Sequence, residues 1–139
     1  MANNKLNQFS LTLLRVVLGI IFTYHGYLNL FVAGGFRGTV ESFTQLGIPM
    51  PVYSALLVTF AEFVGGLLLL IGLLTRLTSL VLIFEILVAF FTVHLKNGIL
   101  VSKGGYEFVL LILAGLFVIL INGAGNLSVG KRFKSKRLH

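Results

Sequence analysis

Four apolar runs, separated by short polar connections, dominate the pattern of the chain. Their lengths are close to the roughly 20 residues that a helix needs to cross a bilayer. The runs are continuous rather than alternating, and lipid-exposed backbone must satisfy its own hydrogen bonds, so they predict helices rather than barrel strands. The predicted spans cover residues 11–31, 53–74, 77–95 and 106–121. We therefore predict an all-α protein with one membrane domain over residues 1–139, folded as an antiparallel bundle of four transmembrane helices.

The connection between the first two spans is the longest and contains both prolines. Phe36, Val40 and Phe43 recur in it at helical spacing, whereas Arg37 and Glu41 form an i,i+4 pair on another face. This pattern predicts a short amphipathic helix that lies at the membrane interface. An ordered loop without membrane contact is the alternative.

The two halves of the chain share a weak repeat. Glu62–Val64 and Glu107–Val109 have the same sequence, Glu-Phe-Val, and each belongs to the return helix of a predicted hairpin. His25 and His94 both lie toward the far end of the outgoing helices. The repeat predicts two similar hairpins that pack side by side in parallel.

The composition is typical of a membrane protein and excludes several kinds of functional site. Hydrophobic residues make up 57% of the chain and charged residues 11%, compared with about 25% charged residues in soluble domains. The mean hydropathy is +1.01. There is no cysteine, which excludes disulfides, thiol catalysis and thiolate metal sites.

Charge is concentrated at the C-terminus. The net charge is +7, and five of the eleven basic residues lie in a tail over residues 129–139. A basic segment next to a membrane helix is a topology signal that also touches anionic lipid, and we do not expect it to bind nucleic acid. With four spans, the tail shares a side with Lys5, Arg15 and Arg76, so the positive-inside rule predicts that both termini are cytoplasmic.

Two charged residues of opposite sign lie within the spans, toward the side of the termini. Counted along the helices, Arg15 lies roughly 6 Å and Glu85 roughly 12 Å from that edge. Their similar depth on the first and third spans predicts a structural ion pair that fixes helix register.

A second polar layer is expected nearer the opposite edge. It consists of His25, Glu62, His94 and Glu107, with Tyr24 and Tyr106 nearby. Carboxyl and imidazole groups that converge in a bundle can bind a metal, relay protons or hydrogen-bond a quinone head group. A metal is the weakest of the three, because a di-iron bundle usually shows Glu-x-x-His and the chain has no such spacing. We predict a ligand site with Glu62 as its central acid; a protonated Glu62 bound to a neighbouring helix is the structural alternative.

Several motifs, in order along nearly the whole chain, resemble the DoxX family. They are Leu14–Phe22 followed by His25-Gly26, Leu46–Pro51, Glu62 with Gly66, Gly72–Arg76, Ala89 with His94, Gly105–Glu107 and the closing Gly123–Ser128. The resemblance implies a four-helix protein of the bacterial or archaeal plasma membrane. The family is named for a subunit linked to a terminal quinol oxidase, and relatives belong to thiosulfate:quinone oxidoreductases or to a membrane complex with superoxide dismutase and a sulfurtransferase. Because this chain lacks cysteine, a thiol-based version of that chemistry is not expected here.

The leading hypothesis is therefore a redox-associated membrane protein that binds a quinone or a similar lipid-soluble ligand among the polar groups. The alternative is a non-catalytic scaffold that recruits redox enzymes as partner subunits. Contact with the lipid bilayer and assembly into a homo-oligomer or hetero-complex are expected in either case. The sequence leaves open whether the chain catalyses a reaction as part of an oxidoreductase.

Overall fold

Helices form all the regular structure of the chain over the residues that the computed structural model describes, 2–130. The five α-helices are α1 (Ala2–Phe31), α2 (Gly35–Gln45), α3 (Pro51–Ile71), α4 (Thr75–Ala89) and α5 (Glu107–Asn122). Helix α4 continues into a π-helical turn, η1 (Phe90–His94), and a 3-10 turn, η2 (Leu95–Asn97), and a second 3-10 turn, η3 (Val101–Lys103), precedes α5. The all-α prediction is confirmed for this range, whereas most of the predicted basic tail, residues 131–139, lies outside it.

Three segments are long and apolar enough to cross a membrane. They are Asn4–Phe31, Pro51–Ile71 and Thr75–Asn97. The fourth apolar helix, α5, has 16 residues and is shorter than these. Helix α1 begins nine residues before the predicted span, because the polar segment ahead of Leu11 continues the helix although it is too polar to be recognised as part of an apolar run.

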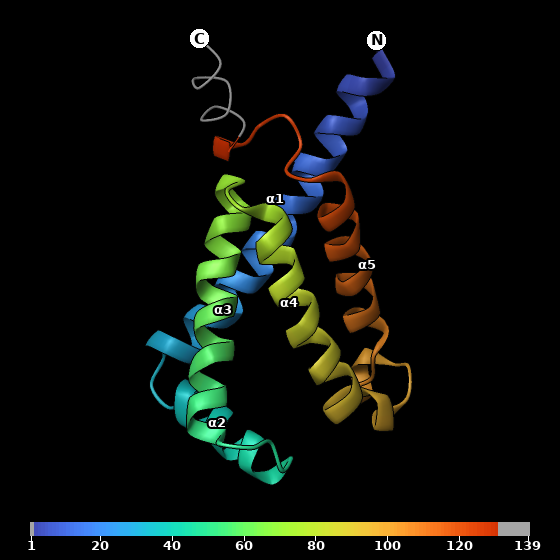
Figure 1. Ribbon diagram of the computed structural model, residues 1–139. Helices are drawn as coiled ribbons and strands as arrows, with labels where there is room; N and C mark the ends of the chain where they lie inside the picture. The colour runs from blue at the N-terminus through green and yellow to red at the C-terminus, as the bar shows by residue number, and fades with distance from the viewer. Residues whose placement is uncertain (1, 131–139) are drawn as a thin grey trace.

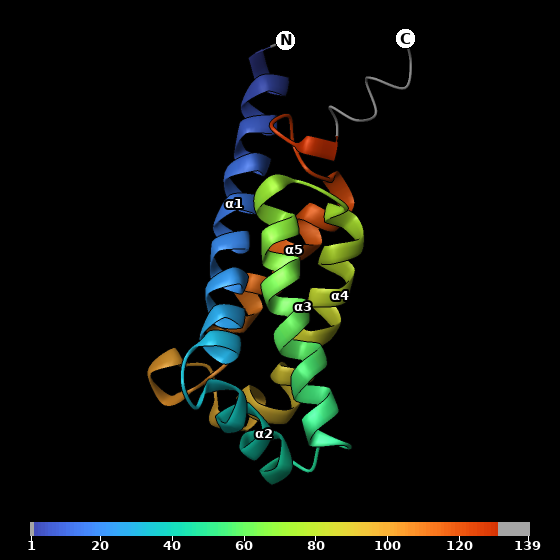
Figure 2. The same cartoon turned by 90° about the vertical axis from the view of Figure 1, so that its left-hand side faces the viewer.

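Different segments of the chain lie at the two ends of the bundle. The first turns of α1, the turn between α3 and α4 and the segment after α5 lie at one end, which we call the terminal end (Figure 1). Helix α2 and the connection from α4 to α5 lie at the opposite end, the α2 end (Figures 1 and 2). Neighbouring helices α1 and α3 run antiparallel along the length between them (Figure 2).

Glycines allow α1 and α3 to approach closely. A Cβ atom on Gly26 would lie 2.6 Å from the Cα atom of Phe63, and one on Gly66 would lie 2.8 Å from the Cα atom of Thr23. A Cβ atom on Gly19 would lie 2.9 Å from the backbone nitrogen of Leu70. Small residues serve this purpose in membrane helices, where dispersion between backbones replaces the hydrophobic effect. Gly19 and Gly26 therefore share the face of α1 that meets α3.

The remaining helices join this pair through an apolar core. Its largest fully buried apolar side chains are Phe22 of α1, Leu69 of α3, Leu82 of α4, and Leu116 and Ile119 of α5. Helix α3 ends at Gly72, whose left-handed φ of 73° allows the Leu73 amide to bond back to the carbonyl of Leu68. The chain then turns directly into α4 and forms a tight hairpin.

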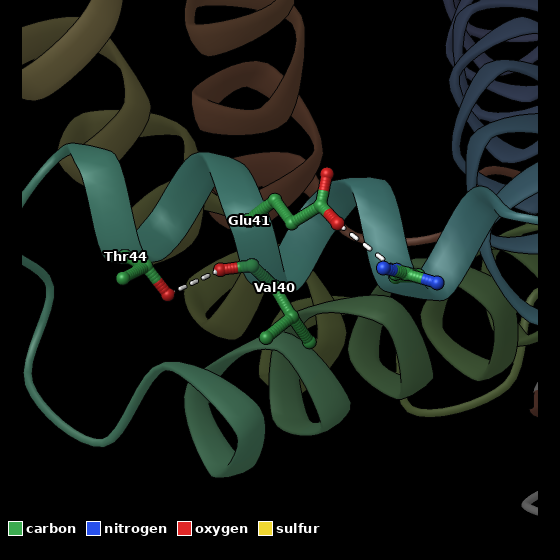
Figure 3. A network of polar contacts seen from close by, with 4 residues as sticks. Val40, Glu41 and Thr44 are labelled. Carbon is green, nitrogen blue, oxygen red and sulfur yellow. Dashed lines mark hydrogen bonds and ion pairs between the residues drawn. The ribbon is translucent and has the colours of Figure 1, made fainter.

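The predicted amphipathic segment is confirmed as helix α2. Phe36, Val40 and Phe43 are half-buried. The side chains of Arg37 and Glu41 are 85% and 60% exposed and form an ion pair of 3.0 Å, shown with the adjacent Thr44–Val40 bond in Figure 3. The apolar face thus lies against the bundle and the charged face points away from it.

The predicted hairpin repeat stays a prediction. The helices do form two antiparallel pairs, α1 with α3 and α4 with α5 (Figure 1). However, Glu62 lies in the middle of α3 whereas Glu107 is the first residue of α5, so the two matching sequences occupy different positions in their helices.

Replacing Gly26 with alanine should destabilise the protein by about 1–3 kcal/mol, because the added methyl group overlaps the α3 backbone, which cannot move without separating the helices. Gly38 in α2 is the matched control, since a Cβ atom there meets nothing within 4 Å. Gly38→Ala should be neutral or slightly stabilising. Thermal unfolding in mild detergent measures both, and equal midpoints would contradict the close approach of α1 and α3.

Candidate functional site

Glu62 is the centre of a polar cluster that four helices build. Its Oε2 atom accepts a hydrogen bond of 3.2 Å from Nδ2 of Asn29 on α1. The Oδ1 atom of Asn29 in turn accepts a bond of 3.2 Å from the hydroxyl of Thr39 on α2. The same hydroxyl lies 3.2 Å from the carbonyl of Gly35. A chain of polar contacts therefore leads from the interhelical position of Glu62 to helix α2.

Helix α4 contributes Glu85, whose carboxyl group is close enough to that of Glu62 to interact with it. Two ionised carboxylates side by side repel each other, so a proton on one of the two groups stabilises this arrangement. The Oε2 atom of Glu85 is buried and has no partner among the described residues. We call Glu62, Glu85, Asn29 and Thr39 the carboxyl cluster.

The hairpin of α3 and α4 explains why the two acids meet. Glu62 lies ten residues before Gly72, and Glu85 lies eleven residues after Leu74. Residues at equal distances from a tight antiparallel turn reach the same depth, since each rises about 1.5 Å per residue. The neighbouring contact between Gly65 and Leu82 follows the same register.

The histidine of α1 lies at the edge of the cluster. His25 is close enough to Glu62 to interact with it electrostatically, and it is exposed on the surface of the bundle. Tyr24, the next residue back, is 59% exposed and points away from the core. Of the predicted ligand-binding residues, His25 and Glu62 are therefore brought together, whereas the side chain of Tyr24 is exposed.

The other predicted residues organise the connection between α4 and α5. Nδ1 of His94 lies 2.7 Å from the carbonyl of Gly104, and Oε1 of Glu107 accepts a bond of 2.6 Å from the Val101 amide. The ring of Tyr106 packs edge-on against Phe90 at a centroid distance of 5.4 Å. These three side chains bind the backbone and aromatic groups of their own loop, so the predicted single polar layer is divided into two separate groups.

The π-helical turn accounts for part of this division. Residues Phe90–His94 follow i→i+5 bonding, which widens the turn and changes the direction of every later side chain relative to a continuous α-helix. Depth counted along an ideal helix could not foresee this change. His94 is consequently placed against the loop at Gly104.

The predicted ion pair between Arg15 and Glu85 is wrong. Arg15 is 1% exposed, and its guanidinium donates to three backbone carbonyls, those of Leu69, Leu70 at 2.8 Å and Leu127 at 2.6 Å. Among the described side chains, the ion pair that forms is Arg37–Glu41. The physical reason is that the end of α3 supplies backbone carbonyls close to Arg15, whereas Glu85 lies deeper and meets Glu62.

Arginines serve as C-terminal caps for two helices at the terminal end. Arg15 binds the last carbonyls of α3, where the helix dipole places partial negative charge. Arg76 donates a bond of 3.1 Å to the carbonyl of Ile121 at the end of α5. The segment after α5 closes over this region, and the Gly130 amide donates to the carbonyl of Gly72 at 3.3 Å.

Sequence reasoning missed Thr39 and gave Glu85 the wrong partner. A signal for Glu85 was present, because its distance from the Gly72 turn matches that of Glu62. A signal for Asn29 was present as well, because it lies one helical turn beyond His25 and therefore on the same side of the helix. No local pattern marks Thr39, which reaches the cluster because α2 folds back against α1 and α3. In the described part of the chain, no three His, Asp or Glu side chains gather as metal ligands.

Comparisons with known proteins agree with the sequence motifs. The sequence model of the DoxX family matches residues 10–95. The chain is 33% identical over 135 residues to the Bacillus subtilis protein named "Putative oxidoreductase CatD", covering 96% of this chain and 95% of that protein. It is 31% identical over 74 residues to the Escherichia coli "Inner membrane protein YphA", covering 53% of this chain and 51% of the relative. No solved structure matches the chain.

Arg15→Lys should lower stability by about 2–3 kcal/mol, because a single ammonium cannot reach the carbonyls of α3 and of Leu127 together and leaves buried acceptors unpaired. Thermal unfolding in detergent measures the loss. Proteolysis should cut the segment after α5 faster in the variant. Arg37→Lys is the control, because that side chain is 85% exposed. Equal unfolding midpoints and equal cleavage rates in the two variants would show that Arg15 does not hold the segment after α5 in place.

Proposed function

The chain belongs to the DoxX family, and we propose that it is a redox-associated membrane protein that binds a quinone or a similar lipid-soluble ligand at the carboxyl cluster. The observation that carries this proposal is the proximity of the carboxyl groups of Glu62 and Glu85 within the bundle. An ionisable group between membrane helices is costly and is usually kept for a function. Here two such groups, the carboxyl groups of Glu62 and Glu85, lie side by side between the helices.

The cluster offers both kinds of hydrogen-bonding group that a quinone needs. A quinone carbonyl accepts a hydrogen bond, which Glu62 or Glu85 can supply when its carboxyl group is protonated. A quinol hydroxyl donates one, which the unpartnered Oε2 atom of Glu85 can accept. Asn29 holds the carboxyl group of Glu62 in place through Oε2. Carboxyl groups exchange protons and not electrons, so the electrons of a quinone reaction come from a partner redox enzyme.

Other observations support the same assignment. The name of the Bacillus subtilis relative describes an oxidoreductase, and that relative aligns over nearly its whole length. His25 is exposed beside Glu62 and can exchange protons between the cluster and the surroundings. In this proposal Tyr24, which is exposed next to His25, lies at the edge of the ligand site. His94, Tyr106 and Glu107 shape the α2 end rather than contact the ligand.

The membrane arrangement is part of the proposal. Helices α1, α3, α4 with its η1 and η2 extension, and α5 cross the bilayer as an antiparallel four-helix bundle. Helix α5 spans about 24 Å, less than the roughly 30 Å of the hydrocarbon core, so the bilayer thins or the connection before α5 enters the interface. Helix α2 lies across the bundle at the outer interface, with Arg37 and Glu41 facing water.

Glu62→Gln and Glu85→Gln should each weaken quinone binding while changing the unfolding midpoint by only a few degrees. The amide keeps the size of the side chain and some of its hydrogen bonding, but it cannot exchange a proton with the ligand. Mass spectrometry of the protein purified in mild detergent measures co-purified quinone, and titration with decylubiquinone measures affinity.

Glu41→Gln is the matched control, because Glu41 is exposed on α2 and outside the cluster. It should bind as wild type does. Unchanged binding in both cluster variants would refute the quinone site. If no sample contained quinone or bound decylubiquinone, the scaffold alternative would replace it, and partner recovery would be tested next.

The topology can be tested with single cysteines, because the chain has none of its own. An impermeant maleimide should label Ser42→Cys and Ser102→Cys in intact bacterial cells, since both residues are exposed at the α2 end. Asn4→Cys, exposed at the terminal end, should be labelled only after the membrane is opened. This follows from the excess of basic residues on the side of the termini. The reverse pattern would invert the orientation, and labelling of all three in intact cells would exclude a membrane-spanning bundle.

A further inference from the structure

The seam between α1 and α5 contains a groove of about 350 Å³. Its floor is made by Leu18 of α1 and by Ile112 and Gly115 of α5, which are buried. Its rim includes Val17 and Leu111, which are 45% and 69% exposed. Gly115 keeps the groove deep, because a Cβ atom there would lie 3.2 Å from Leu18 Cδ1 and occupy part of it.

The chemistry of the groove is uniform. All its lining residues are apolar; they include Leu14 and Val118 at the terminal end and Ile21 and Phe108 toward the α2 end. The groove therefore runs along the two helices, parallel to the direction of a lipid chain in a membrane. A polar ligand would find no hydrogen-bonding side chain there, whereas a hydrocarbon chain gains dispersion contacts along the whole length.

The terminal end of the groove leads to positive charge. Arg76 is exposed and donates one hydrogen bond, to the carbonyl of Ile121, three residues beyond Val118 of the groove. A guanidinium has five N–H donors, so Arg76 retains donors for an anion. Lys5 is exposed at the same end. The four acidic residues of the chain lie in the middle of the bundle or at the α2 end, so none opposes this charge.

We propose that this groove is a binding site for an anionic phospholipid of the leaflet next to the termini. One acyl chain fills the space between α1 and α5, and the phosphate lies beside Arg76. Arginine recognises phosphate through paired hydrogen bonds, and each basic residue near an anionic membrane surface contributes about 1 kcal/mol. The bound lipid would complete the packing between α1 and α5. This inference does not depend on the quinone site, because no residue of the carboxyl cluster lines the groove.

The test compares two lipids that differ only in the headgroup, dioleoyl phosphatidylglycerol and dioleoyl phosphatidylcholine. Each is titrated into the full-length, delipidated protein in detergent, and binding is followed by native mass spectrometry and thermal unfolding. Phosphatidylglycerol should bind more tightly and raise the unfolding midpoint further. Arg76→Gln should reduce the preference for phosphatidylglycerol by roughly fivefold, the equivalent of one basic contact. Arg37→Gln, at the opposite end, should leave the preference unchanged.

The acyl-chain part of the site has its own variant. Ala114→Trp fills the groove from its rim and should abolish binding of both lipids at the site. Leu57→Trp is the matched control, because Leu57 is 73% exposed on α3 and lies outside the groove. If Ala114→Trp fails to fold, the headgroup preference in Arg76→Gln still decides the proposal.

Three results would overturn the lipid assignment. The first is equal binding of the two lipids to wild type, and the second is an unchanged preference in Arg76→Gln. The third is a dimer in light scattering that Ala114→Trp dissociates, because the groove would then receive a helix of a second copy. Loss of lipid preference with intact quinone binding in Arg76→Gln would separate this site from the carboxyl cluster.

Discussion

Hydrocarbon offers no hydrogen-bond partner, so a polar side chain between membrane helices is stabilised by partners within the protein, and this constraint shapes the arrangement of the bundle. Arg15 meets it at the terminal end by binding the carbonyls that end α3 and the carbonyl of Leu127. Glu62 meets it nearer the α2 end by binding Asn29 and Glu85. Between these two polar contacts the glycines of α1 and α3 leave no room for a side chain, so the two helices cannot slide past each other without breaking both.

The same constraint links structure to the proposed activity. Two neighbouring carboxyl groups are stabilised when one of them holds a proton, so loss of that proton would weaken the contact between α3 and α4. Asn29 and Thr39 connect this position to α1 and α2. A ligand that takes or gives a proton at Glu62 would therefore alter contacts among four helices. In the proposed function this ligand is a quinone.

Sequence alone predicted the helical fold, three of the spans by length and composition, the amphipathic helix α2 and the family, because each depends on periodicity or on motifs that are local. Partners of buried polar groups depend on helix rotation and on backbone acceptors, which composition does not reveal. Arg15 was assigned a carboxylate because charges are visible in a sequence, whereas the carbonyls that it binds are present at every residue. His94 was placed with Glu62 because depth was counted along a regular helix, and the π-helical turn that redirects it has no clear sequence signature.

The bond between Arg15 and the Leu127 carbonyl joins residues 112 positions apart and has a consequence for biosynthesis. Chains fold from the N-terminus during synthesis, so α1 and α3 are made long before Leu127. In that interval the guanidinium lies between helices with only the end of α3 to bind. The last acceptor arrives with the segment that follows α5. This bond thus forms only after the final helix has been made, and a chain truncated before Leu127 would leave one N–H group of Arg15 without its acceptor.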